Sequence, residues 1–205
     1  MASMHARILP QRLARLVCIL LLVAATAAAD RTAAQSPPTG EEPAGRARRI
    51  DALFAALKTT RVEEEGDAMV AEIWRLWLQS GRPDLDAAMQ QATNLMNSGL
   101  SVLAMPTFDD IVAKAPDWAE AWNKRATALY LLGEHDRSLA DIDRVLALEP
   151  RHFGALAGMG LIRIAKGEPR EALSAYRRAL AVNPFLKERH GLIPELERQV
   201  GERPL

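Results

Sequence analysis

The chain has 205 residues, of which 49% are hydrophobic and 25% charged, as is usual for a soluble globular protein. Its 26 basic and 26 acidic residues balance, so no overall charge attracts nucleic acid or a membrane surface. Residues 1–29 carry three arginines and no acid, and the rest of the chain has 23 basic and 26 acidic residues, a net charge of −3. We therefore expect no nucleic-acid partner.

Residues 1–29 have the pattern of a secretory signal peptide, with arginines before an apolar run (residues 16–23) and small residues after it (24–29). The run is shorter than the roughly 20 apolar residues that cross a bilayer, so we predict cleavage after Ala29 and a periplasmic or secreted chain without stable membrane insertion. An N-terminal anchor in the inner membrane is the alternative. The only cysteine, Cys18, lies in this segment, which leaves the mature chain no thiol for a disulfide, a metal or a nucleophile.

Residues 30–46 mix proline, glycine, alanine and glutamate without apolar periodicity, and we predict a disordered linker. Residues 47–84 then have the pattern of a helical hairpin. Its first helix has an apolar stripe at Ile50, Leu53, Phe54 and Leu57. Thr60 and Glu63 have the spacing of a capping box, which predicts the start of the second helix. No stretch of the chain alternates apolar and polar residues as a strand does, so we expect an all-α protein.

A regular repeat is the strongest pattern in the sequence. Three glycines are spaced by 34 residues: Gly99, Gly133 and Gly167. Three prolines have the same spacing: Pro116, Pro150 and Pro184. The separation between each glycine and its proline is 17. Gly66 and Pro83 keep that separation, but the step from them to Gly99 and Pro116 is 33. Glycine permits a tight turn between two helices and proline ends the second helix, so the spacing predicts stacked helix pairs.

Residues 119–152 and 153–186 resemble the tetratricopeptide repeat (TPR) family. The matching residues are Trp122, Ala126 and Pro150 in the first, and Gly160, Ala172, Tyr176, Ala179 and Pro184 in the second. Residues 85–118 resemble a diverged repeat through Ala92, Gly99, Ala104, Phe108 and Pro116, and residues 47–84 a degenerate one. The resemblance implies a right-handed α-solenoid of about three to four helix pairs, with a capping helix and tail over residues 187–205.

Some residues depart from the family pattern. Arg125 and Arg163 stand where apolar residues are usual, and Val145 where a small one is. Pro106 lies inside an expected helix, where it removes a hydrogen bond and clashes with the preceding turn. We expect that helix to begin late, with Pro106 in its first turn, or to kink.

The sequence offers little for catalysis, and we predict no enzyme, no cofactor and no metal site. His135, His152 and His190 lack the spacing of metal ligands, so we expect them at the surface or packed in turns. Adjacent acids such as Asp109 and Asp110 point apart on a helix. Trp74, Trp77, Trp118 and Trp122 stand at helical spacing beside leucines, which favours a core role.

The resemblance also implies a concave groove lined by the first helix of each pair. The implied groove residues are Met89, Thr93, Met96, Asn123, Lys124, Thr127, Tyr130, Ala157, Leu161 and Ile164. Such a face suits an extended peptide or a one-sided helix. Some family members hold a partner's terminal carboxylate with several cations, but here Lys124 is the only one, so we expect no such clamp.

We therefore expect an extracytoplasmic scaffold, adaptor or assembly factor that binds a protein or peptide partner. A structural envelope protein that self-associates through exposed helix ends is the alternative from another class. A hydrolase of envelope polymers, acting through acids and tryptophans of residues 62–84, is the least favoured, because no nucleophile or matched acid pair is present.

Overall fold

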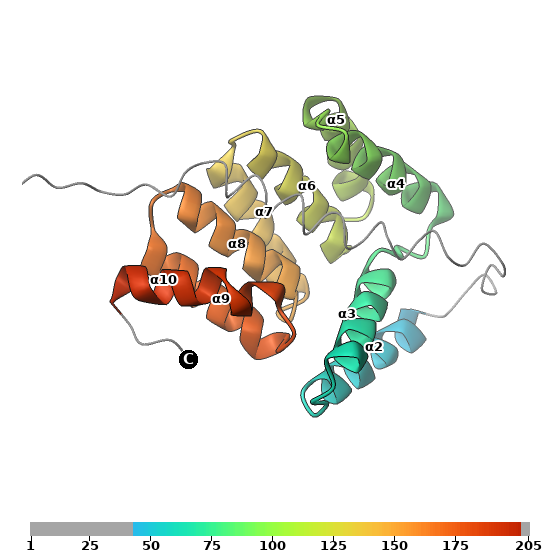
Figure 1. Ribbon diagram of the computed structural model, residues 1–205. Coiled ribbons are helices and arrows are strands. Elements are labelled where there is room, and N and C mark those ends of the chain that lie inside the picture. The colour runs from blue at the N-terminus through green and yellow to red at the C-terminus, as the bar shows by residue number, and fades with distance from the viewer. Residues whose placement is uncertain (1–42, 202–205) are drawn as a thin grey trace, which may run out of the picture. The chain divides into compact units, whose positions relative to one another are not determined.

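The structure is a computed structural model in which residues 43–201 are described. All regular structure in this range is helical, without any strand (Figure 1). The helices are α2 (Pro43–Leu57), α3 (Glu63–Trp77), α4 (Pro83–Asn97), α5 (Ser101–Lys114), α6 (Ala119–Leu131), α7 (His135–Leu148), α8 (Phe153–Ala165), α9 (Pro169–Val182), the 3-10 helix η2 (Lys187–His190) and α10 (Leu192–Val200). The prediction of an all-α solenoid is confirmed. The predicted signal peptide and most of the predicted linker lie outside the described residues.

Three helix pairs, α4–α5, α6–α7 and α8–α9, pack in chain order. Within each pair a glycine at positive φ makes the turn: Gly99 at 80°, Gly133 at 79° and Gly167 at 76°. The residue after each glycine donates its N–H to a carbonyl near the end of the first helix, as Glu134 does to Leu129 at 2.9 Å. This closure needs a left-handed residue, which glycine adopts without strain, so the predicted turns are confirmed.

The predicted prolines also lie where a second helix ends. Pro116, Pro150 and Pro184 each follow α5, α7 or α9 by two residues. The earlier pair does not share this role, because Gly66 lies inside α3 and Pro83 opens α4. Our extension of the glycine and proline pattern to these two residues was wrong. Gly81, at a φ of 82°, makes the turn before α4 instead.

Small residues allow the two helices of a pair to approach closely. Gly160 of α8 lies against the ring of Tyr176 on α9, and a Cβ built at Gly160 would be 2.5 Å from that ring. Ala126, Ala172 and Ala179 are almost completely buried, so larger side chains at these positions would also lack space. The match of these positions to the family pattern therefore has a steric cause.

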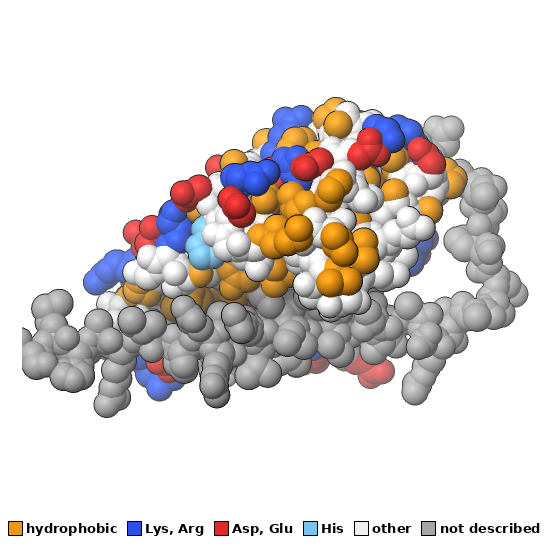
Figure 2. Space-filling view, turned by 90° about the horizontal axis from the view of Figure 1, so that it is seen from above, with side chains coloured by type: hydrophobic (Ala, Val, Ile, Leu, Met, Phe, Trp, Pro, Cys, Tyr) orange, Lys and Arg blue, Asp and Glu red, His pale blue; other side chains and the backbone are white. Residues whose placement is uncertain are grey.

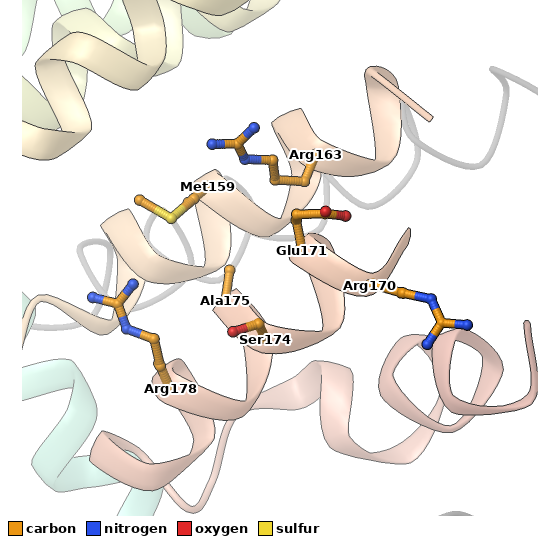
Figure 3. Close-up of a pocket in the computed structure, with 7 residues that line it drawn as sticks. All are labelled: Met159, Arg163, Arg170, Glu171, Ser174, Ala175 and Arg178. Carbon is orange, nitrogen blue, oxygen red and sulfur yellow. The ribbon is translucent and has the colours of Figure 1, made fainter. Parts of the chain in front are cut away.

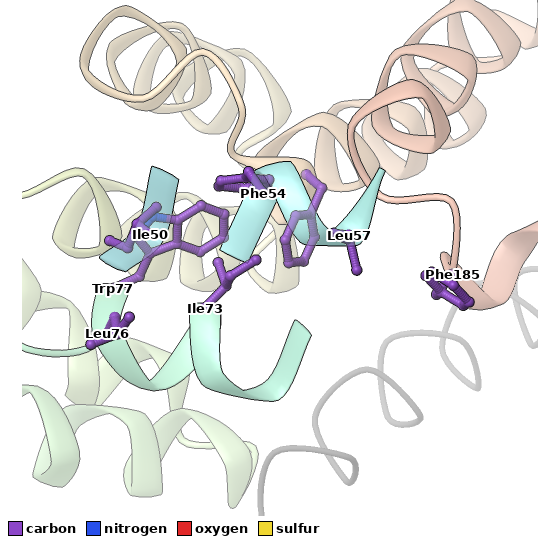
Figure 4. Close-up of a cluster of buried hydrophobic side chains, with 8 residues drawn as sticks. Ile50, Phe54, Leu57, Ile73, Leu76, Trp77 and Phe185 are labelled. Atoms are coloured by element: carbon purple, nitrogen blue, oxygen red, sulfur yellow. The ribbon is translucent and has the colours of Figure 1, made fainter. Parts of the chain in front are cut away.

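The helices α2 and α3 form a hairpin with an aromatic core (Figure 4). The cluster contains Ile50, Phe54 and Leu57 of α2, Ile73, Leu76 and Trp77 of α3, and Phe153 and Phe185 from the later repeats. Gly66 of α3 lies directly against Phe185, where an added Cβ would be 2.5 Å from the ring. Two ion pairs, both 2.8 Å long, also join the hairpin to the segments beside Phe153 and Phe185. They link Asp51 to Arg151 and Asp67 to Lys187. The hairpin thus packs on residues that are distant in the sequence.

The N-terminal boundaries differ from those predicted. The helix α2 begins at Pro43, so residues 43–46 of the predicted linker are helical. The residue before α3 is Val62, whose N–H donates to the Thr60 hydroxyl at 3.2 Å. Thr60 itself donates to Glu65 at 2.7 Å, so the predicted capping box with Glu63 is wrong.

Pro106 lies inside α5, which begins five residues earlier at Ser101. The prediction of Pro106 in the first turn is therefore wrong. The helix continues through the proline with one backbone hydrogen bond fewer, because residue 106 has no N–H to donate. At the C-terminus, α10 begins directly after Gly191 with Pro194 in its first turn and packs on α9, as expected of a capping helix.

Candidate functional site

The ten predicted groove residues lie on α4, α6 and α8, the first helices of the three pairs. These helices contact one another, α4 with α6 and α6 with α8, so they form one continuous face, which we call the first-helix face. Five of the ten residues are buried: Met89, Met96, Asn123, Ala157 and Leu161. The other five are half-buried: Thr93, Lys124, Thr127, Tyr130 and Ile164. A partner on this face can touch chiefly the second group.

One end of this face contains a buried carboxylate. Glu120, in the first turn of α6, is 1% exposed. Its Oε2 lies 2.9 Å from Nε2 of His152 and accepts a hydrogen bond from Asn123 at 3.0 Å. Its Oε1 faces Nζ of Lys124 at 3.4 Å, an ion pair too long for a good hydrogen bond. Nδ1 of His152 accepts the N–H of Ala155 at 3.1 Å, so the ring proton lies on Nε2 and points at Glu120.

The surroundings of Glu120 keep it ionised. Burial by itself raises the pKa of Glu120, but the charge of Lys124 and the hydrogen bonds from His152 and Asn123 outweigh burial, and the pKa lies below its ordinary value. The charge of Lys124 is therefore balanced within the protein. A carboxylate of a partner would have to compete with Glu120 for Lys124.

Two tryptophans of the N-terminal hairpin cover this cluster. The Trp77 indole stacks on the His152 ring, with centroids 4.1 Å apart and planes 9° apart. Nε1 of Trp118 donates to the backbone carbonyl of Trp77 at 2.8 Å. Trp74 packs over Gly154 in α8. Trp118 and His152 are one repeat apart, so the hairpin contacts the same turn of two successive repeats.

Sequence reasoning did not find the cluster of Glu120, His152 and Trp77. The sequence does contain a hint of the cluster. The large side chains Trp118, His152 and Leu186 are spaced by 34 residues, and each directly precedes a helix: α6, α8 or η2. The partner in the hairpin has no such signal, since Trp77 is far from His152 along the chain. Only the folded chain brings these two rings together.

The four tryptophans pack against the core of the protein. Trp77 and Trp118 are buried, while Trp74 and Trp122 are half-buried against the core, which confirms the prediction that they pack inside the protein. The buried rings are inaccessible to a sugar or a base. His135 stacks on Tyr130 with centroids 5.8 Å apart.

The described part of the chain, residues 43–201, contains no group of three or more His, Cys, Asp or Glu side chains able to hold a metal ion. Within the same range, every helix is too short or too polar to span a bilayer. His190 is exposed and His152 is packed in a turn, as predicted for the histidines.

No protein-family model matches the chain. A TPR repeat-containing protein of Rhizobium etli is 36% identical to it over 137 residues, which are 67% of this chain and 67% of the relative. The chain belongs to the tetratricopeptide repeat family. Two further proteins give shorter matches: small glutamine-rich tetratricopeptide repeat-containing protein 2 of Saccharomyces cerevisiae, 29% identical over 80 residues, and anaphase-promoting complex subunit 7 of Dictyostelium discoideum, 33% identical over 75 residues. These matches span 23% and 13% of the two proteins, and 39% and 37% of this chain.

Solved structures show the same TPR fold. Two crystal structures of MamA match with TM-scores of 0.54 and 0.53 at 17% and 18% identity. They cover 80% and 77% of this chain, and 88% and 85% of their own. At these identities the likeness concerns the fold alone.

Proposed function

We propose that this TPR protein is a non-catalytic, extracytoplasmic scaffold that holds a protein partner on its first-helix face. The observation that carries the proposal is the row of half-buried side chains on three consecutive first helices, from Thr93 on α4 through Thr127 and Tyr130 on α6 to Ile164 on α8. The row changes from polar to apolar along the stack. Such a surface suits an extended peptide or a helix with one apolar side.

The experiment is recovery of partners with the full chain, affinity-tagged at its C-terminus and purified after crosslinking in cells. The test variant combines Thr127→Arg, Tyr130→Ala and Ile164→Arg, because these half-buried side chains tolerate replacement better than the buried Leu161. The control is Arg137→Glu, on the exposed side of α7. We expect the wild type and the control to recover the same partner and the triple variant to lose it. Equal recovery from all three would refute binding on this face.

The extracytoplasmic location rests on the signal-like pattern of residues 1–29. It is tested by N-terminal sequencing of the protein purified from its native envelope. We expect the sequence to begin at Asp30. A start at Met1 would contradict cleavage after Ala29, and recovery of the protein from the cytoplasm would contradict export.

A second candidate function, self-association, is favoured by one observation. Large apolar side chains are exposed in two places: Leu100 before α5 with Val102 and Leu103 in its first turn, and Leu131 and Leu132 at the end of α6. Figure 2 shows hydrophobic side chains gathered in the middle of the face seen from above. Exposed apolar patches of this kind mark interaction sites.

Light scattering over a range of protein concentrations tests self-association. If the protein self-associates, we expect its average molar mass to rise with concentration. The mass of a Val102→Asp, Leu103→Asp variant should stay at the monomer value. A wild type that is monomeric at every concentration would exclude it.

A further inference from the structure

An open hollow of about 340 Å³ lies between α8 and α9, in the last repeat (Figure 3). We call it the α8–α9 hollow. It is lined by Met159 and Arg163 of α8 and by Arg170, Glu171, Ser174, Ala175 and Arg178 of α9. A second hollow of about 410 Å³ shares Arg170, Ser174 and Arg178 with it, so α9 presents one polar ridge to both. Neither hollow includes any of the predicted groove residues.

Comparison with the preceding repeat explains why this site is hollow. One repeat earlier, the place of Met159 is taken by Arg125 and that of Ala175 by Asp141. There, the Arg125 guanidinium makes two hydrogen bonds to Asp141, at 2.8 and 2.7 Å, and a third to Asp109 of α5 at 2.9 Å. The half-buried ion pair between Arg125 and Asp141 occupies the junction between helices in that repeat. Methionine and alanine cannot replace it, and they leave an apolar floor.

The rim of the hollow has an excess of positive charge. Three arginines and Glu171 line it, and Glu168 beside Arg163 adds a second acid, so the net charge here is +1, on a protein whose chain after residue 29 has a net charge of −3. Arg163 already pairs with Glu168 at 2.6 Å. Arg170 and Arg178 are exposed and make no ion pair with any of residues 43–201. Two guanidinium groups are thus left to bind carboxylates, which they do in a planar, two-point geometry.

We propose that the α8–α9 hollow is a second docking site, which binds an acidic segment of a partner protein, with carboxylates on Arg170 and Arg178 and an apolar side chain on Met159 and Ala175. Arg170 and Arg178 are eight residues apart on one helix, about 12 Å along its axis. An extended peptide covers that distance in about four residues. The segment that fits therefore carries two acidic residues about four positions apart with an apolar residue between them.

A protein segment fits better than an anionic membrane or a nucleic acid. Those ligands present a dense array of phosphates, and they select surfaces with four or more cations free of acids. Glu168 and Glu171 stand among the arginines here and would repel such an array. A peptide can place its few charges between them, so the mixed rim selects for a ligand with spaced carboxylates.

The probe is a fluorescein-labelled peptide of twelve residues with two glutamates four positions apart and a leucine between them, and its control replaces both glutamates by glutamine. Fluorescence anisotropy is measured with the full chain. The first variant, Arg170→Glu with Arg178→Glu, reverses the rim charges, and exposed Arg48→Glu with Arg137→Glu is its matched control. The second variant, Met159→Arg with Ala175→Asp, rebuilds the ion pair of the preceding repeat and fills the hollow without removing a rim arginine. Unfolding curves of all variants establish that each is folded.

We expect the wild type and the Arg48/Arg137 variant to bind the glutamate peptide alike, and both other variants to bind it about tenfold more weakly or not at all. The glutamine peptide should bind no better than the weakened variants do. Equal binding by all four proteins, or stronger binding of the wild type to phosphatidylglycerol vesicles than to the peptide, would overturn the proposal. The triple variant of the first-helix face should bind the peptide normally, so the two sites fail or succeed independently.

Discussion

The imidazole of His152 and the carboxylate of Glu120 form a hydrogen bond 2.9 Å long between two successive repeats, with both side chains completely buried. Glu120 belongs to the first turn of α6, and His152 directly precedes α8. The stacked ring of Trp77 brings the N-terminal hairpin to the same point. One polar contact therefore connects two repeats and the hairpin that covers them.

Replacing His152 by leucine should strongly destabilise the protein. The change leaves the Glu120 carboxylate buried without its histidine donor and removes the ring on which Trp77 stacks. Removing one hydrogen-bond donor from a buried polar group costs about 1–3 kcal/mol of unfolding free energy, and more when that group is charged. Urea unfolding followed by tryptophan fluorescence measures it. His190→Leu, at an exposed position, should change stability by no more than about 0.5 kcal/mol, and a similar small effect at position 152 would contradict the role of the pair.

The stabilisation by Glu120 should depend on pH. Because the folded-state pKa of Glu120 lies below its ordinary value, the ionised carboxylate stabilises the fold at neutral pH, and this contribution is lost as the pH falls through the folded-state pKa. We expect Glu120→Gln to be less stable than the wild type at pH 7, and the difference to shrink below about pH 4, the region of an ordinary glutamate pKa. Unfolding free energies at several pH values measure it. A difference that is constant across this range would be inconsistent with an ionised Glu120.

Glu188 of η2 should behave in the opposite way. Its side chain is 6% exposed, and burial raises the pKa of Glu188 above its ordinary value. The folded state then holds a proton that the unfolded state has lost, so Glu188 destabilises the protein as the pH rises above the ordinary glutamate value. Glu188→Gln should raise the melting temperature at pH 7 and leave it nearly unchanged at pH 4. The exposed Glu134→Gln serves as the control, and an equal effect at both pH values would argue against this assignment.

Two glycines of α8 should respond oppositely to alanine. At Gly160 a new Cβ would lie 2.5 Å from the Tyr176 ring, whereas at Gly158 the nearest atom, Cδ1 of Ile142, is 3.7 Å away. Gly160→Ala should therefore cost about 1–3 kcal/mol through overpacking. Gly158→Ala should stabilise the helix by up to about 1 kcal/mol, because alanine favours helix over glycine. Thermal unfolding of both variants tests this, and equal midpoints would mean that the α8–α9 contact adapts freely.

The repeats were predictable because their signals are local. The turn at Gly133 needs a left-handed residue wherever it occurs, and Pro150 ends a helix whatever surrounds it. The same reasoning failed at Gly66, which has the right spacing from Pro83 but is small because Phe185 lies against it. Composition alone does not distinguish a turn glycine from a packing glycine, since both positions simply lack a side chain.

The first-helix face was likewise predicted only in part. The sequence placed ten residues on the first helices through their repeat positions, but it did not show that Asn123 and Leu161 are buried while Thr127 and Ile164 remain accessible. Nor did it assign a role to Met159 and Ala175, which stand one repeat after Arg125 and Asp141 and cannot form an ion pair. Burial depends on what covers a residue, and that is a property of the folded chain.

By itself, the sequence determined that this protein is helical, repeats at a regular interval and is a TPR protein, because periodicity, turn glycines and helix-ending prolines act over a short stretch of chain. Only the tertiary structure decided that the hairpin of α2 and α3 packs on turns of the later repeats and closes over Glu120 and His152. It also decided where a hollow with an arginine rim remains open. The physical reason is that these contacts join distant segments, and their energies depend on the shape and burial that the whole fold creates.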